Sequence, residues 1–203
     1  MQLIDPRNHP DYPDLELLYV PGFIPHAEQQ MLYQRLMEEG KWQQDKITVF
    51  GKEYDQPRLT ALYAEDGLSY SYSDIHMQSH PMSEDLKNLQ NRLWQEHQHR
   101  FNAVLLNRYR SGTDSNGWHS DDEPELGTNP CIASISLGQD RIFQMRHKRL
   151  KEARFKFLLE AGSLLIMRGA TQHHWQHQLP KTRRAIGERI NLTFRYLIDP
   201  SNN

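Results

Sequence analysis

The stretch CIASISLGQDRIFQMRHKRLKEARFKFLLEAGSLLIMR, residues 131–168, decides the fold class. It contains four short segments rich in β-branched, aromatic and aliphatic residues, at 131–137, 141–147, 154–159 and 163–168. The connectors between them are too short to hold a crossover helix, so consecutive strands must pair in antiparallel fashion. This pattern favours a β-sandwich or a jelly roll.

Three further segments of the same texture lie outside this stretch, at residues 102–109, 173–178 and 189–198. The connectors contain Ser-Gly, Asn-Gly and Ala-Gly, which are typical of tight turns. We therefore predict a mainly β fold with flanking helices, in which residues 101–198 form a double-stranded β-helix, or jelly roll. Residues 1–100 are expected to form an N-terminal extension of that single domain.

Two helices are predicted in the extension. Apolar residues at helical spacing indicate one helix in residues 25–40, where Gly40 occupies the C-terminal cap position. A second helix is predicted in residues 82–99, where Ser83 is a suitable N-cap and acidic residues follow it. Both apolar stripes, including Met31 and Trp94, are expected to face the core.

The remaining parts of the extension are shorter. ITVF at 47–50 and LTALYA at 59–64 are predicted strands that either pair as a hairpin or extend a sheet. The segment through about residue 25 is rich in Pro, Asp and Tyr, and we predict an irregular arm that ends in the short apolar run LELLYVPGF at 15–23. Cys131, the only cysteine, lies in an apolar run, which indicates a buried structural residue in a reducing compartment.

Composition limits the class of protein. The 203 residues are 37% hydrophobic and 25% charged, and no apolar run approaches the roughly 18 residues that a membrane span needs. The acidic, proline-containing N-terminus does not resemble a secretory signal, so we expect neither export nor membrane association. We expect a monomer, cytoplasmic if the source is bacterial and nuclear if it is eukaryotic.

Charge is unevenly distributed along the chain. Residues 1–100 carry nine Lys and Arg against sixteen Asp and Glu, whereas residues 101–203 carry fifteen against ten. Much of the basic excess lies in 141–156 and around 181–184, where a polyanion could dock. The net charge of −2 weighs against a nucleic-acid-binding role based on charge alone, and a solvated strand-and-turn face is the alternative.

A metal site is indicated by GWHSDDEPE, residues 117–125. On a strand, His119 and Asp121 would emerge on the same face, so one imidazole and one carboxylate could grip a metal. The third ligand is open, because His173, His174 and His177 all lie in the same predicted strand and its alternation does not choose among them. Two histidines and one carboxylate are typical of non-haem Fe(II) oxygenases.

Several motifs together resemble the AlkB family of Fe(II)/2-oxoglutarate dioxygenases. They are Asn107-Arg-Tyr109, His119-x-Asp121, His174-Trp-Gln-His177-x-Leu-Pro and Arg189-x-Asn-x-Thr-x-Arg195, and the resemblance covers about residues 50–198. It implies His177 as the third iron ligand, and O₂ with 2-oxoglutarate as co-substrates.

The same resemblance implies that Asn107, Tyr109, Arg189 and Arg195 bind 2-oxoglutarate. A guanidinium can take the distal carboxylate of this co-substrate in a bidentate, charge-assisted pair. We assign Arg195 to that carboxylate and Arg189 to the end nearer the metal.

On the substrate side, VFGKEYDQPR at 49–58 and DGLSYSYS at 66–73 resemble the nucleotide-recognition region of the duplex-DNA repair branch. The resemblance implies that Phe50 fills the gap left by a flipped base. The expected base pocket comprises Tyr70, Tyr72, His119 and Glu123, with Arg58 in support. Tyr72 departs from the branch, which typically has Phe there.

A basic turn follows the metal-bearing strand. Lys181, Arg183 and Arg184 match a turn that contacts the phosphate backbone in this branch, and such contacts position DNA without reading its sequence. The implied reaction is oxidative demethylation of bases such as 1-methyladenine and 3-methylcytosine in DNA, with release of formaldehyde. DNA is expected to be double-stranded, with single-stranded DNA as the alternative. Other possibilities are an RNA or protein demethylase or hydroxylase, and a catalytically silent DNA-damage binding module.

Overall fold

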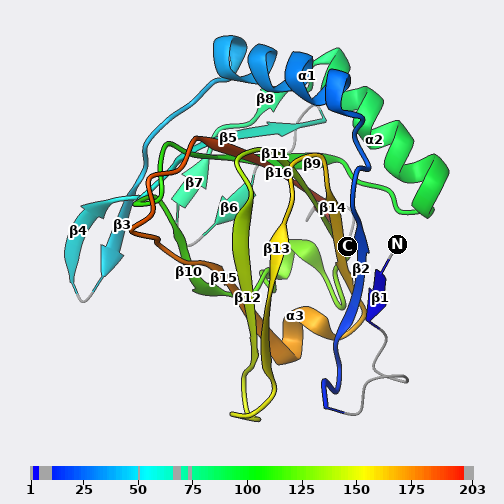
Figure 1. Cartoon of the computed structure of the whole chain (residues 1–203), viewed down its shortest axis with the longest axis vertical. Coiled ribbons are helices and arrows are strands. Elements are labelled where there is room, and N and C mark those ends of the chain that lie inside the picture. Colours follow the sequence, from blue (N-terminus) through cyan, green and yellow to red (C-terminus); the bar gives the residue numbers. More distant parts are fainter. Residues whose placement is uncertain (1, 5–10, 50, 66–69, 73–74, 199–203) are drawn as a thin grey trace.

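The computed structural model describes residues 2–4, 11–49, 51–65, 70–72 and 75–198. Its strands form one eight-stranded sheet and one four-stranded sheet that face each other, together with two separate hairpins (Figure 1). Apart from the short parallel β5–β8 pair, the described pairings are antiparallel. This confirms the prediction of a jelly roll.

The elements have the following bounds. The large sheet, in spatial order, contains β1 Gln2–Ile4, β2 Glu16–Val20, β14 Leu164–Arg168, β11 Ile132–Gly138, β16 Arg189–Arg195, β9 Ala103–Tyr109, β5 Leu59–Ala64 and β8 His80–Pro81. The small sheet contains β10 Asn116–His119, β15 Trp175–Leu179, β12 Arg141–His147 and β13 Arg154–Leu159. The hairpins are β3 Lys46–Val49 with β4 Lys52–Asp55, and β6 Tyr70–Tyr72 with β7 Ile75–Met77. The helices are α1 His26–Glu39, α2 Glu84–His97, α3 Thr171–His174 and the 3₁₀ helix η1 Pro124–Leu126.

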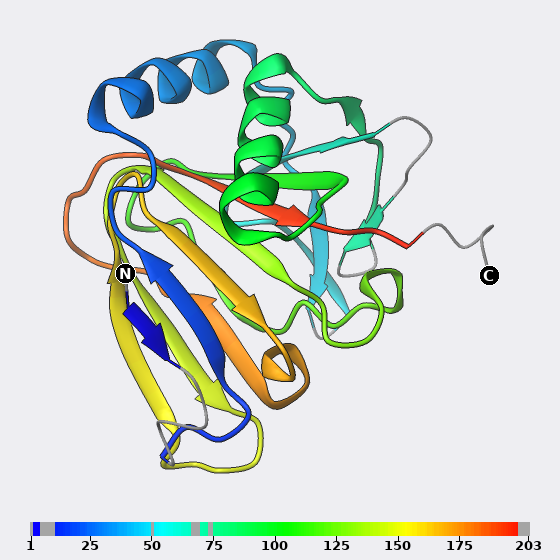
Figure 2. The same ribbon diagram turned by 90° about the vertical axis from the view of Figure 1, so that its right-hand side faces the viewer.

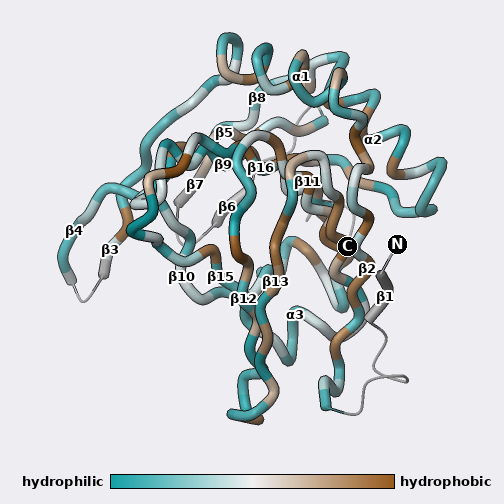
Figure 3. Tube along the Cα trace, viewed as in Figure 1, coloured by the Kyte–Doolittle hydropathy of each residue, from teal (hydrophilic) through white to brown (hydrophobic). Residues whose placement is uncertain are grey.

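The large sheet is buried on both faces. One face packs under α1 and α2, as Figures 1 and 2 show, and the other faces the small sheet. Alternation along β16 follows this division, because Ile190, Leu192 and Phe194 belong to the core beneath the helices. Hydrophobic residues concentrate on the strands, whereas α1 and the β3–β4 hairpin are mostly hydrophilic (Figure 3).

Both predicted helices are confirmed, with changes in detail. Ser83 Oγ caps α2 by accepting a hydrogen bond from Leu86 N at 3.4 Å. Met31 and Trp94 are exposed, which contradicts their assignment to the core-facing stripes. Gly40 ends α1 at φ −59°, so it does not adopt the left-handed conformation of many glycine caps. A Cβ at this position would lie 2.4 Å from Leu36 O, so close packing is the reason for glycine.

The predicted irregular N-terminal arm is wrong for residues 16–20. This segment forms β2, which pairs with β14 over five residues and extends the large sheet. Prolines flank the apolar run, and this favoured the prediction of an arm. The strand was also not evident from local sequence because its hydrogen-bonding partner lies almost 150 residues further along the chain. No helix among the described residues is long and apolar enough to cross a membrane.

Candidate metal and co-substrate site

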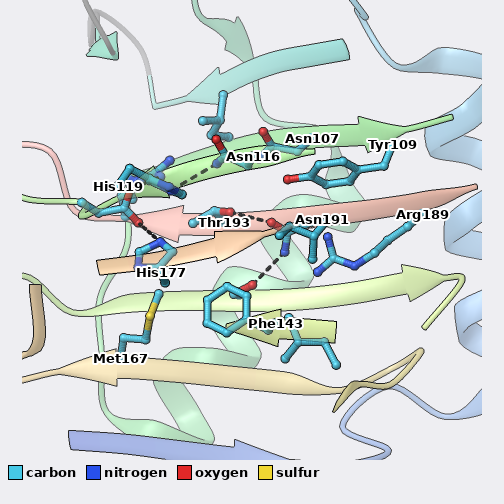
Figure 4. Close-up of a pocket in the computed structure, with 16 residues that line it drawn as sticks. Asn107, Tyr109, Asn116, His119, Phe143, Met167, His177, Arg189, Asn191 and Thr193 are labelled. Atoms are coloured by element: carbon cyan, nitrogen blue, oxygen red, sulfur yellow. Dashed lines mark hydrogen bonds and ion pairs between the residues drawn. The ribbon is translucent and has the colours of Figure 1, made fainter. Parts of the chain in front are cut away.

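A pocket that opens to solvent lies between the two sheets (Figure 4). Polar side chains from β9, β10, β15 and β16 converge in it, although the surrounding layers are apolar. Its lining comprises Leu105, Asn107, Tyr109, Asn116, His119, Asp121, Ser134, Phe143, Leu159, Met167, His177, Leu179, Arg189, Asn191, Thr193 and Arg195.

A β-bulge shapes the β10 side of the pocket. Asn116 lies opposite Leu179 and His119 lies opposite His177, so β10 has one residue more than β15 over the same span. Asn116 and His119 therefore both line the pocket although they are three residues apart. β10 ends at His119, so Asp121 lies in the following loop. The two side chains therefore do not come together through strand alternation, and the prediction gave the wrong reason for their proximity.

The structure brings His119, Asp121 and His177 together. Their ligand atoms lie within 4.8 Å of one another, with His177 Nε2 4.0 Å from Asp121 Oδ2. The competing histidines do not join them, because residues 171–174 form α3 rather than strand. His173 Nε2 instead accepts a hydrogen bond from Asn129 N, and His174 lies near Asp14.

The protonation states suit a divalent cation. Burial would raise the pKa of Asp121, but Arg195, His177 and His119 lower it to about 2, so the carboxylate is ionised at neutral pH. Burial, and then the neighbouring His119, lowers the pKa of His177 to about 3. His119 Nδ1 donates to Gly117 O at 2.7 Å, so Nε2 carries the lone pair; it accepts from Asn116 Nδ2 at 3.1 Å and is the atom that a metal would take. Two neutral imidazoles and one carboxylate fit Fe(II) and leave coordination positions for co-substrates.

A second group of this kind consists of Asp14, His147 and His174. His147 Nδ1 accepts hydrogen bonds from the backbone N–H groups of Arg149 and Leu150, at 3.1 and 3.0 Å. The neutral ring must therefore carry its proton on Nε2, the atom that faces Asp14. A metal would need that lone pair, so the chemistry of this group does not match a metal centre.

Gln172 holds the backbone of the ligand loop. It is fully buried on α3, and its Oε1 accepts a hydrogen bond from Asp121 N at 2.9 Å. Because Asp121 lies beyond the end of β10, this contact fixes a segment that no strand partner fixes.

We expect Gln172→Leu to weaken Mn(II) binding about 10- to 100-fold, since partners outside the coordination sphere have effects of this size. Equilibrium titration of Mn(II) without co-substrates measures it. Gln34→Leu, an exposed change on α1, is the control for the substitution itself. A lower melting temperature with unchanged Mn(II) affinity would show that Gln172 is only structural.

The four residues assigned to 2-oxoglutarate line the pocket from the paired strands β9 and β16, and Figure 4 shows Asn107, Tyr109 and Arg189. Asn107 and Asn191 are opposite each other on β9 and β16, as are Tyr109 and Arg189. Arg195 Nη2 donates to Asp121 Oδ1 at 2.8 Å, so Arg195 lies at the metal end. Arg189 lies six residues away on the same strand, which reverses the assigned order of the two arginines. Their roles in binding remain predictions.

Other lining residues were not assigned to the site from the sequence, although Asn191 and Thr193 belong to the motif that ends at Arg195. Asn191 and Thr193 occupy the alternate positions of β16 between the two arginines, and Asn191 Nδ2 donates to Ser134 Oγ at 2.7 Å. Alternation in RINLTFR was the available signal, because polar residues on a strand buried on both faces indicate a site. Asn116, whose Nδ2 lies 3.1 Å from His119 Nε2, gave no such signal, because the bulge changes its facing.

The predicted substrate residues are only partly placed. Phe50 lies outside the described residues, as do the side chains of Tyr70 and Tyr72, whose backbones form β6. Arg58 is buried and donates to Asn107 Oδ1 at 2.7 Å, so it supports the co-substrate wall. Glu123 is half-buried at the start of η1.

The basic turn predicted to contact phosphates follows β15 at the surface. Its three cations, Lys181, Arg183 and Arg184, are exposed. Thr182 N donates to Gly112 O at 2.8 Å, which ties the turn to the loop before β10.

Comparisons with known proteins agree with this geometry. A profile of the 2OG-Fe(II) oxygenase superfamily matches residues 16–195. Human alpha-ketoglutarate-dependent dioxygenase alkB homolog 3 is 44% identical over 184 residues, 86% of this chain; the chain spans 64% of that protein's length. Mouse DNA oxidative demethylase ALKBH2 is 39% identical over 75% of this chain and 67% of its own length.

Solved structures support the fold. The structure of OsALKBH1 superposes with a TM-score of 0.59 at 18% identity, covering 88% of this chain and 97% of that one. A 2OG-Fe(II) oxygenase family oxidoreductase from Burkholderia pseudomallei gives the same TM-score at 16% identity, covering 89% and 84%. With a His119–Asp121–His177 triad, of which Asp121 and His177 are buried, in an arginine-lined pocket, the chain belongs to the AlkB family of the 2OG-Fe(II) oxygenase superfamily.

Proposed function

We propose that this protein is an oxidative demethylase of N-alkylated bases in DNA, acting on lesions such as 1-methyladenine and 3-methylcytosine. The observation that carries the proposal is the shared carboxylate of Asp121. One oxygen faces His177 and the other accepts from Arg195, so the metal triad and the co-substrate wall form one unit. The relatives named as DNA oxidative demethylases support DNA as the substrate.

The residues of this chain bind and orient the metal, the co-substrate and the base, and they exclude water from the site. His119, Asp121 and His177 would hold Fe(II), and the arginines would hold 2-oxoglutarate. When bound, Fe(II) with 2-oxoglutarate and O₂ would supply hydroxylation of the N-methyl carbon; the hemiaminal product would release formaldehyde, and succinate and CO₂ would be the co-products. Phe143 stacks on His177 with ring centroids 5.3 Å apart, which shields the inner side of the site from solvent.

The hairpins are suited to present a base to this site. Ser115 N, directly before β10, donates to Pro57 O at 2.8 Å and ties the segment after β4 to the strand that carries His119. Figure 1 shows the β3–β4 hairpin projecting beyond β10. We propose that Tyr70 and Tyr72 stack on the flipped base, with Glu123 at its polar edge, and that Lys181, Arg183 and Arg184 contact the phosphate backbone.

We expect Phe50→Ala to lower kcat/KM on methylated duplex DNA about 10-fold or more and to leave single-stranded DNA within about twofold. An inserted apolar side chain offsets the loss of base stacking, which costs a few kcal/mol and arises only in a duplex. Steady-state kinetics on matched duplex and single-stranded oligonucleotides measure the difference. Equal losses on both substrates would contradict the wedge role.

The direct test of function is turnover. Protein with Fe(II) and 2-oxoglutarate is incubated with DNA containing 1-methyladenine or 3-methylcytosine, and formaldehyde, succinate and the restored base are quantified. Equimolar formaldehyde and restored base support the proposal. Exclusive turnover of methylated RNA would indicate an RNA demethylase, and DNA binding without succinate formation would indicate a silent binding module.

A further inference from the structure

The outer face of the small sheet carries cations without acidic partners. Alternation along β12 and β13 turns Arg146, Arg154 and Lys156 toward solvent. Register places Arg146 directly opposite Arg154, and like charges in that position destabilise a sheet. Within the described part of the chain, none of the three joins an ion pair. An anionic ligand would relieve this repulsion.

A planar platform lies beside these cations. The guanidinium of Arg146 lies 4.2 Å from the ring centroid of Trp118 on β10, and it also donates to Gln176 Oε1 at 3.1 and 2.9 Å. These contacts hold the guanidinium over the indole. Trp118 and all three cations line one open hollow on this face. Aromatic rings and arginine planes are the surfaces on which unpaired bases stack, while neighbouring cations take phosphates.

This platform is close to the metal site along the chain. Trp118 directly precedes His119, and the alternation of neighbouring residues along β10 turns the two side chains to different faces of the small sheet. β10 is an edge strand of that sheet, on the side where Figure 1 shows the β3–β4 hairpin. Because β10 is an edge strand, a nucleic-acid strand can pass around it from the pocket side of the sheet to Trp118.

We propose that this face, defined by Trp118, Arg146, Arg154 and Lys156, binds the single-stranded nucleic acid that flanks the modified base. The proposal rests on the proposed function. Arg154 and Lys156 contact phosphates, and the Arg146–Trp118 stack receives a base. A protein partner is less well matched, because the face combines several uncompensated cations with a stacking surface, and no acidic side chain is among the described residues that line the hollow.

The test compares short and long substrates with the charge-reversed variant Arg154→Glu/Lys156→Glu. A methylated trinucleotide has only one nucleotide on either side of the modified base, whereas an oligonucleotide of about fifteen residues extends well beyond it. We expect KM for the long substrate to rise about 10-fold, with kcat and trinucleotide kcat/KM within about twofold of wild type. The slope of log affinity against log salt should fall by about 1.4, or about 0.7 for each phosphate contact.

The matched control is Lys41→Glu/Lys87→Glu, which makes the same charge change on exposed residues at the helical side. An equal KM rise in this control, or an equal loss on the trinucleotide, would overturn the proposal. Fluorescence anisotropy with unmethylated single-stranded DNA measures binding without turnover, so it distinguishes failure of the proposed function from failure of the proposed surface. If no methylated substrate is turned over, the proposed function fails, and weaker binding by the face variant alone still supports the surface. Unchanged binding refutes it.

Discussion

Asp121→Asn is expected to abolish Mn(II) binding at micromolar concentrations and to lower kcat/KM at least about 1000-fold. The asparagine is nearly isosteric and can still accept from Arg195, so the change mainly removes the ligand charge. Metal centres contribute several kcal/mol to transition-state stabilisation, and each 1.36 kcal/mol is a factor of ten in rate. Isothermal titration with Mn(II) measures the affinity, and succinate formation measures the rate.

Asp14→Asn is the matched control, because Asp14 also lies beside two histidines. The proton on His147 Nε2 argues against a metal there, so wild type and Asp14→Asn should each bind one Mn(II) per chain. Two binding events in the wild type, with one lost in Asp14→Asn, would contradict our interpretation of the second group. Unchanged Mn(II) binding by Asp121→Asn would contradict the assignment of the iron site.

The jelly roll was predictable because its strands are short, regular and closely spaced, so local pattern alone required antiparallel pairing. The two helices were predictable for the same reason. Prediction failed where a distant partner decides the structure. β2 exists because β14 accepts it as a neighbour, and the short apolar run at residues 16–20 does not by itself distinguish a strand from an arm.

The metal site shows the same division. His119 and Asp121 were correctly paired, but they converge through a bulge and a loop held by Gln172, rather than through strand alternation. For the third ligand, the local sequence left three histidines open. The structure separates them because α3 withdraws His173 and His174 from the strand, which spacing along the sequence could not reveal.

The two pocket arginines differ in their compensation. Arg195 is paired with the ionised Asp121, whereas Arg189 has no carboxylate within ion-pair distance among the described residues. Arg189 is nevertheless almost fully buried, and its Nε has no hydrogen-bond partner. Burial lowers its pKa to about 10, which still leaves it charged at neutral pH. A buried, uncompensated guanidinium indicates the place of an anion, and we therefore assign the distal carboxylate of 2-oxoglutarate to Arg189.

Methionine at either position should separate the two roles by opposite effects on stability. Arg189→Met removes an uncompensated buried charge, so the melting temperature of the ligand-free protein should not fall. Arg195→Met leaves the Asp121 carboxylate without its partner and should cost about 3–5 kcal/mol of stability.

With 2-oxoglutarate at about 100 times its Kd, wild type should gain about 2.7 kcal/mol of stability, or roughly 5–10 °C in melting temperature, and Arg189→Met should gain almost nothing. Thermal unfolding with Mn(II), with and without 2-oxoglutarate, measures both effects. If Arg189→Met kept the full thermal shift, the distal carboxylate would have to bind elsewhere, because methionine cannot form a charge-assisted pair with it.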